Sequence, residues 1–272
     1  MRHLLLAFGG SPSSVMASHW AASYASARDA AVTIAHVLPP DRAHDGASAP
    51  ELSELASPEL IAVFEEAGVA HDSRLLMGDA AAQILAAADE MDADMIIMGR
   101  RIHTFAHPRL LGPLTRRLLD GTNRPVAIVP APFEQPGREQ VLPTAVVGID
   151  GSEESPVVFD VAMKVAQPLG LDLEALTVLG RDHAPEADQT RWLPDTAITR
   201  STGQEGPRSQ IRVSAPTLVG IPTDELLARS ALAEALILGT HRHSPLGRLL
   251  DQSTSHFCAA RASCPVVLVP LD

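Results

Sequence analysis

The chain carries one sequence pattern twice, and this repeat constrains its fold more than any other feature. The first copy begins with HLLLAFGGSPSS (3–14), and TAVVGIDGSEES (144–155) begins the second in the same way. Three landmarks recur at a common offset of 140 positions, namely Gly99 with Gly239, Pro125 with Pro265 and Pro130 with Pro270. A period this long indicates a duplicated domain, because the repeats of solenoid proteins span only about 20–50 residues.

The length of 272 residues suits two domains of ordinary size, since single domains commonly have roughly 100–150 residues. We expect the first domain at 1–132, a linker at 133–143 and the second domain at 144–272. Prolines, a glycine and charged residues crowd the segment around this linker, as is typical of a connection between domains.

Short apolar runs alternate with longer helical segments in both copies, which predicts α/β domains. Each is expected to be Rossmann-like, with a five-stranded, mostly parallel sheet flanked by helices. The strands are expected at 3–8, 31–37, 69–76, 94–98 and 125–129, and again at 144–149, 171–178, 211–219, 235–238 and 266–269. Helices are expected at 14–28, 52–67, 79–91 and 113–122. The second copy is rich in proline, glycine and polar residues over 180–210, which predicts a reduced helix or a mobile loop there.

The last strand of each copy is apolar and bounded by proline, as PVAIVP and PVVLVP. Apolar strands at the edge of a sheet promote association. We therefore expect the two copies to pair through these strands in an intramolecular, pseudo-two-fold arrangement, and a homodimer of chains is a further expectation.

Composition excludes several classes of partner. The net charge of −12 disfavours nucleic acids and anionic membranes, both of which attract basic surfaces. No apolar stretch approaches the roughly 18 residues that a membrane span needs. Only two cysteines occur, so a disulfide framework is not indicated and a reducing cytoplasm is the expected location.

Ligands of open parallel sheets bind beyond the carboxyl ends of the strands, where the strand order reverses. Three segments of each copy are expected to end there. They are the turn after the first strand (Gly9 or Asp150), the end of the second strand (Val37 or Val178), and the glycine loop after the fourth strand, which leads into the last helix. A loop that enters a helix N-terminus suits phosphate, because free amides and the helix dipole converge at that point.

The Asp-Gly-Ser turn after the first strand (150–152), the glycine loop and the closing PVVLVP strand resemble the universal stress protein family, here in its tandem form. This resemblance implies an adenine-nucleotide α-hydrolase-like fold and a cytoplasmic stress-response role. In one branch of the family it also implies binding of ATP or AMP, with Mg²⁺ accompanying ATP, and without strong catalysis.

The nucleotide-binding branch uses the pattern G-x2-G-x9-G-[S/T] after the fourth strand and an aspartate after the first. In the first copy Gly99 and Gly112 match, but Gly9 stands in place of the aspartate, Ile102 replaces the second glycine and Pro113 replaces the hydroxyl residue. Ile102 offers phosphate no polar group, and Pro113 has no amide hydrogen. We therefore expect this copy to have a degenerate site that no longer binds triphosphate.

The second copy keeps more of the pattern. Its candidate nucleotide-binding residues are Asp150, Val178, Gly239, Arg242, Gln252, Ser253 and Thr254. Arg242 and Gln252 replace glycines, whereas Ser253 fits the hydroxyl position. Two readings of Arg242 stay open, because its guanidinium either clamps phosphate through two hydrogen bonds or pairs in solvent with an acid such as Asp251.

The sequence favours a binding or regulatory module with unidentified protein partners over an enzyme. Asp150 is the only strong candidate for the acidic residue that a hydrolase would need. A slow ATPase or another nucleotide-hydrolysing enzyme is therefore the alternative, and no catalytic residue is assigned. A second alternative is a small apolar-ligand binding protein, because Ile102 makes the first site more apolar. His241, His243 and His256 do not form a ligand pattern, so no metal site is expected.

Overall fold

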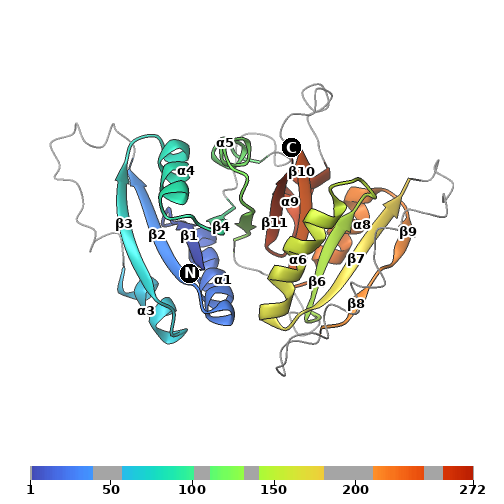
Figure 1. Cartoon of the computed structure of the whole chain (residues 1–272), viewed down its shortest axis with the longest axis horizontal. Coiled ribbons are helices and arrows are strands. Elements are labelled where there is room, and N and C mark those ends of the chain that lie inside the picture. Colours follow the sequence, from blue (N-terminus) through green and yellow to red (C-terminus); the bar gives the residue numbers. More distant parts are fainter. Residues whose placement is uncertain are drawn as a thin grey trace. The chain divides into compact units, whose positions relative to one another are not determined.

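The computed structural model describes residues 2–38, 57–100, 111–131, 141–180, 211–241 and 254–271. The chain divides into two compact units, Met1–Phe133 (unit 1) and Glu134–Asp272 (unit 2). Figure 1 labels the elements of both units.

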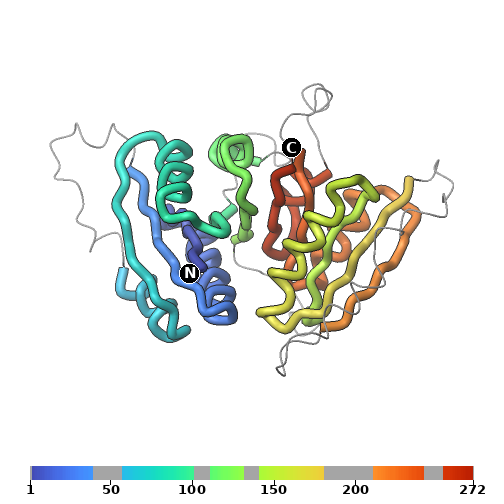
Figure 2. The backbone as a smooth tube through the Cα atoms, viewed as in Figure 1, coloured from blue at the N-terminus to red at the C-terminus, as the bar shows by residue number. Residues whose placement is uncertain are grey.

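Unit 1 contains one parallel sheet with the order β3-β2-β1-β4-β5. Its strands are β1 (His3–Ala7), β2 (Ala31–Leu38), β3 (His71–Met77), β4 (Met95–Gly99) and β5 (Val126–Val129). Its helices are α1 (Pro12–Arg28), α3 (Pro58–Glu66), α4 (Ala80–Glu90) and α5 (Pro113–Gly121). The colours of Figure 2 follow this path, from the blue of β1 within the sheet to the cyan of β3 at its edge.

Unit 2 repeats this topology, because its strands follow the order β8-β7-β6-β10-β11 and β9 also pairs with β7. Its strands are β6 (Thr144–Ile149), β7 (Asp172–Leu179), β8 (Val213–Ser214), β9 (Thr217–Val219), β10 (Ala235–His241) and β11 (Val266–Leu271). Its helices are α6 (Ser155–Leu169), α8 (Pro222–Ser230) and α9 (Thr254–Arg261). All of these pairings are parallel, which confirms the predicted α/β fold.

The helices of unit 1 lie on both faces of its sheet, and the direction of each crossover determines the face on which its helix lies. The β1-α1-β2 and β3-α4-β4 crossovers run in opposite directions across the sheet, and right-handed crossovers of opposite direction place their helices on opposite faces. Accordingly α1 contacts α3, and α4 contacts α5. The central strands are therefore covered on both sides, and Leu4, Leu5 and Leu6 of β1 have no exposed surface.

The helices of the described segments are all too short or too polar to cross a membrane.

The prediction of one strand over 211–219 is wrong, because two short strands, β8 and β9, occupy this segment. Ala215 and Pro216 separate them. Proline has no amide hydrogen to donate to a neighbouring strand, and its carbonyl instead accepts from the Thr177 amide at 3.1 Å. Most of the segment 180–210, and the first residues of the helix expected at 52–67, lie outside the described residues. That helix is described from Pro58, with Ser57 as its N-cap.

An ion pair joins the start of α4 to α5. Asp79 is the N-cap of α4, and its carboxylate accepts from the Ala82 amide at 2.9 Å. The same carboxylate accepts two hydrogen bonds from the Arg117 guanidinium, at 2.6 and 2.7 Å. The hydrogen bonds from Arg117, and then that from Ala82, lower the pKa of Asp79 from 3.8 to about 2.

Replacing Asp79 with Asn should make unfolding less sensitive to acid. The folded-state pKa lies below the unfolded-state value, so the ionised carboxylate stabilises unit 1 above about pH 4, and this contribution is lost as the pH falls towards 2. Urea unfolding midpoints, followed by circular dichroism, should separate Asp79→Asn clearly from the original chain at pH 5 and should lie closer together at pH 2.5, where much of the contribution is lost. The control Arg117→Gln should behave alike, and an equal separation at both pH values would contradict the prediction.

Candidate ligand-binding site

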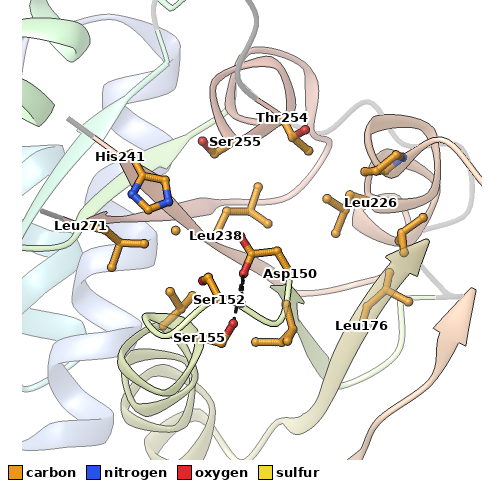
Figure 3. Close-up of a pocket in the computed structure, with 16 residues that line it drawn as sticks. Asp150, Ser152, Ser155, Leu176, Leu226, Leu238, His241, Thr254, Ser255 and Leu271 are labelled. Carbon is orange, nitrogen blue, oxygen red and sulfur yellow. Dashed lines mark hydrogen bonds between the residues drawn. The ribbon is translucent and has the colours of Figure 1, made fainter. Parts of the chain in front are cut away.

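A pocket of about 230 Å³ lies within unit 2, beyond the carboxyl ends of β6, β7 and β10 (Figure 3). The chain leaves β6 through α6 towards β7, whereas α9 follows β10 and leads to β11 on the other side. The two connections diverge from the neighbouring strands β6 and β10, which is the arrangement that leaves a crevice at the edge of a parallel sheet. The order of the strands in the sheet therefore determines where the pocket lies.

Asp150 comes directly after β6 and faces this pocket. Its Oδ1 atom accepts a hydrogen bond from the Ser152 amide at 3.0 Å and another from the Ser155 hydroxyl at 3.1 Å, which Figure 3 also shows. Partial withdrawal from water raises the pKa of the carboxyl, but the hydrogen bonds from Ser152 and Ser155 lower this pKa by a larger amount. The pKa of Asp150 therefore lies below its ordinary value. Its Oδ2 atom accepts no hydrogen bond from the described residues. The pocket therefore holds a carboxylate that stays ionised near neutral pH and has one oxygen available to a ligand.

Apolar and polar side chains are distributed unevenly around the pocket. Leu176 of β7 and Leu226 of α8 lie at one end, and Leu271 and His241 lie at the other (Figure 3). Thr254 and Ser255, at the start of α9, lie across the pocket from Asp150. Such a lining suits a ligand with an apolar ring and with hydroxyl or amino groups that donate to a carboxylate.

Four of the seven candidate residues in the second copy line this one pocket. They are Asp150, Val178, Gly239 and Thr254. Arg242, Gln252 and Ser253 lie outside the described residues. Sequence reasoning missed the leucines of the lining, among them Leu226 and Leu271, because the motif names only positions near loops and strand ends. Ser155, whose hydroxyl donates to Asp150, was also not among the candidate residues.

Gly99 of unit 1, which corresponds to Gly239 of unit 2, is packed differently. A Cβ atom on Gly99 would lie 2.5 Å from the backbone carbon of Ser13 and from the backbone nitrogen of Ser14. Helix α1 begins at Pro12, two residues before the expected start, and its first turn lies directly against Gly99. By contrast, a Cβ atom on Gly239 would meet only side-chain atoms, of Leu271 and Val158.

The other candidate residues of unit 1 lie at the ends of its elements. Gly9 follows β1 and is exposed, and Val37 is the penultimate residue of β2. Gly112 is the N-cap of α5 and Pro113 is its first residue, so no side chain caps this helix. Ile102 lies outside the described residues.

Replacing Gly99 with Ala should destabilise unit 1 by about 1–3 kcal/mol, the usual cost of overpacking, because the first turn of α1 must move to admit a methyl group. The measurement is the urea dependence of the circular dichroism signal. Gly121→Ala is a matched control, because its Cβ would lie equally close, at 2.4 Å, but to the flexible end of the Leu85 side chain. A loss of stability in Gly121→Ala as large as that in Gly99→Ala would contradict this explanation.

Replacing Ser155 with Ala should raise the pKa of Asp150, because one hydrogen bond to the ionised carboxylate is lost. Carboxyl carbon chemical shifts, followed by NMR as a function of pH, report this pKa directly. Ser14→Ala provides the control, since Ser14 is the counterpart in unit 1 and its hydroxyl donates to the Ser11 carbonyl. An unchanged Asp150 titration in Ser155→Ala would refute the assignment.

Comparisons with known proteins agree with the duplicated fold. The family model described as the universal stress protein family matches residues 1–130 and again 143–270. The universal stress protein Rv1996 of Mycobacterium tuberculosis is 23% identical over 305 residues, which cover 99% of this chain and 96% of that protein. The crystal structure of a universal stress protein from Archaeoglobus fulgidus has a TM-score of 0.73 at 20% identity and covers 98% of both chains. The functionally unknown protein PA1789 from Pseudomonas aeruginosa has a TM-score of 0.68 at 13% identity, over 100% of this chain and 93% of its own. Because its two halves each match the family model, this chain belongs to the universal stress protein family and is a tandem member of it.

Proposed function

We propose that this tandem universal stress protein is a regulatory module in which unit 2 binds an adenine nucleotide, ATP or AMP, and unit 1 binds none. One observation carries the proposal: candidate residues from four separate segments of the sequence line the same pocket. Those residues are Asp150, Val178, Gly239 and Thr254. Convergence of separate segments on one cavity is what a binding site requires.

The pocket offers a complementary group for each part of a nucleotide. Leu176, Leu226 and Val178 provide apolar contact for a base, and Asp150 Oδ2 accepts from a hydroxyl or amino group. Thr254 and Ser255, across the pocket from Asp150, offer hydroxyl groups and the first turn of α9 to a phosphate group. Carboxylate oxygen is also a ligand that Mg²⁺ accepts, so Asp150 fits the ion that would accompany ATP.

Binding suits this site better than hydrolysis. A general base works best with a pKa near the operating pH, whereas the pKa of Asp150 is lowered below its ordinary value. Asp150 is also the only carboxylate among the described residues that line the pocket. A slow ATPase is therefore the weaker alternative, and sustained phosphate release that Asp150→Ala abolishes would establish it.

The leucine-rich lining also favours a second candidate, the binding of a small apolar molecule. The two differ in their dependence on Asp150, because an apolar ligand gains nothing from a carboxylate. Cytoplasmic location, the domain bounds 1–132 and 144–272, pairing of the two copies through their last strands, and a homodimer all stay predictions.

Isothermal titration of the full chain with AMP, and with ATP and Mg²⁺, tests the proposal. We expect one site per chain, because Asp150 has no carboxylate counterpart at Gly9. Asp150→Ala should weaken binding by about tenfold or more, the equivalent of a lost charge-assisted hydrogen bond of about 1.5–3 kcal/mol. Gly9→Ala, at the matching position of unit 1, should bind as the original chain does.

Three outcomes would refute the proposal. They are two equivalent sites per chain, unchanged affinity in Asp150→Ala, and no heat of binding at millimolar nucleotide.

A further inference from the structure

The side chain of Leu271 lies over Gly239 within the pocket of unit 2. A Cβ atom on Gly239 would lie 2.7 Å from Leu271 Cδ1 and 3.0 Å from a methyl group of Val158. Leu271 is the last residue of β11, is 7% exposed, and pairs with His241 of β10. Figure 3 shows Leu271 and His241 together at the end of the pocket away from Leu176. The space that a glycine leaves open is thus occupied by a leucine of the same chain.

The fold itself does not demand a leucine at this position. The repeat aligns Leu271 with Ala131, which follows Pro130 just as Leu271 follows Pro270. Unit 1 has the same sheet order, but its strand β5 ends at Val129, and the alanine lies beyond that end. The size of the Leu271 side chain is therefore a property of the pocket in unit 2 and not a requirement of the topology.

The small volume of the pocket and the apolar side chain of Leu271 both act against a long phosphate chain. The cavity of about 230 Å³ is smaller than the roughly 300–1,000 Å³ of typical small-molecule sites. A phosphate placed against Leu271 would also lose water without gaining a hydrogen bond from that side chain, which costs free energy.

We propose that Leu271 is a specificity-determining residue, which makes the pocket of unit 2 prefer a nucleoside or a nucleoside monophosphate to the triphosphate. This inference rests on the proposed function, since it concerns the same pocket. The leucine acts by occupying the space over Gly239 through which the second and third phosphates would have to pass.

The experiment compares the affinities of adenosine, AMP and ATP with Mg²⁺ for the full chain by isothermal titration. The original chain should bind adenosine and AMP about tenfold or more tightly than ATP, a difference of about 1.4 kcal/mol. Leu271→Ala should reduce this preference about tenfold, with the adenosine affinity changed less than about threefold. Leu271→Val should give an intermediate preference, and Leu271→Met, which conserves volume, should keep the original one.

Thermal unfolding of each variant shows whether β11 stays in place. The inference fails alone if adenosine binds but Leu271→Ala leaves the preference unchanged, or if the original chain binds ATP as tightly as adenosine. If none of the three ligands binds any of the proteins, the proposed function fails and this inference fails with it.

Discussion

The site depends on one constraint, namely that the crossovers from the parallel neighbours β6 and β10 run in opposite directions across the sheet. Parallel neighbouring strands cannot be joined by a tight turn, so every such pair needs a crossover connection. Where the crossovers from two adjacent strands run in opposite directions, neither crossover covers the carboxyl ends of those strands. Asp150 and Gly239 lie on those two strand ends, and α9 begins beside them. A carboxylate, a glycine and a helix start therefore meet in one place although they are far apart in the chain.

The two copies show how one topology permits different use of the same position. Gly99 and Gly239 occupy the same position of the repeat, and neither site has room for a Cβ atom. The obstacle at Gly99 is the backbone of α1, whereas at Gly239 it is two side chains. Side chains change by single substitutions, but a helix backbone is held by its own hydrogen bonds. The space beside Gly239 in unit 2 can therefore be changed by substituting one neighbouring side chain, whereas the space beside Gly99 in unit 1 is fixed by the backbone of α1.

The chemistry of the pocket follows from one carboxylate in largely apolar surroundings. Withdrawal from water opposes ionisation of Asp150, and the bonds from Ser152 and Ser155 overcome that opposition. Both bonds end on Oδ1, so the protein fixes the orientation of the carboxylate while leaving Oδ2 to a ligand. A fixed acceptor with a low pKa binds donors well and removes protons poorly, which is the physical reason for placing binding before catalysis in this member of the family.

The amino-acid sequence alone determined the duplication, the α/β class, most strands and the prominence of Asp150 and Gly239. Each of these depends on local pattern or on comparison of the two copies. The broken strand at Pro216 was signalled by a proline that the apolar pattern outweighed. Only the tertiary structure brought Leu226 and Leu271 into the pocket and placed α1 against Gly99, because these contacts join segments whose spacing in the chain carries no periodic signal. Whether a leucine fills a core or a ligand site is decided by what packs beside it, and that is a property of the folded chain.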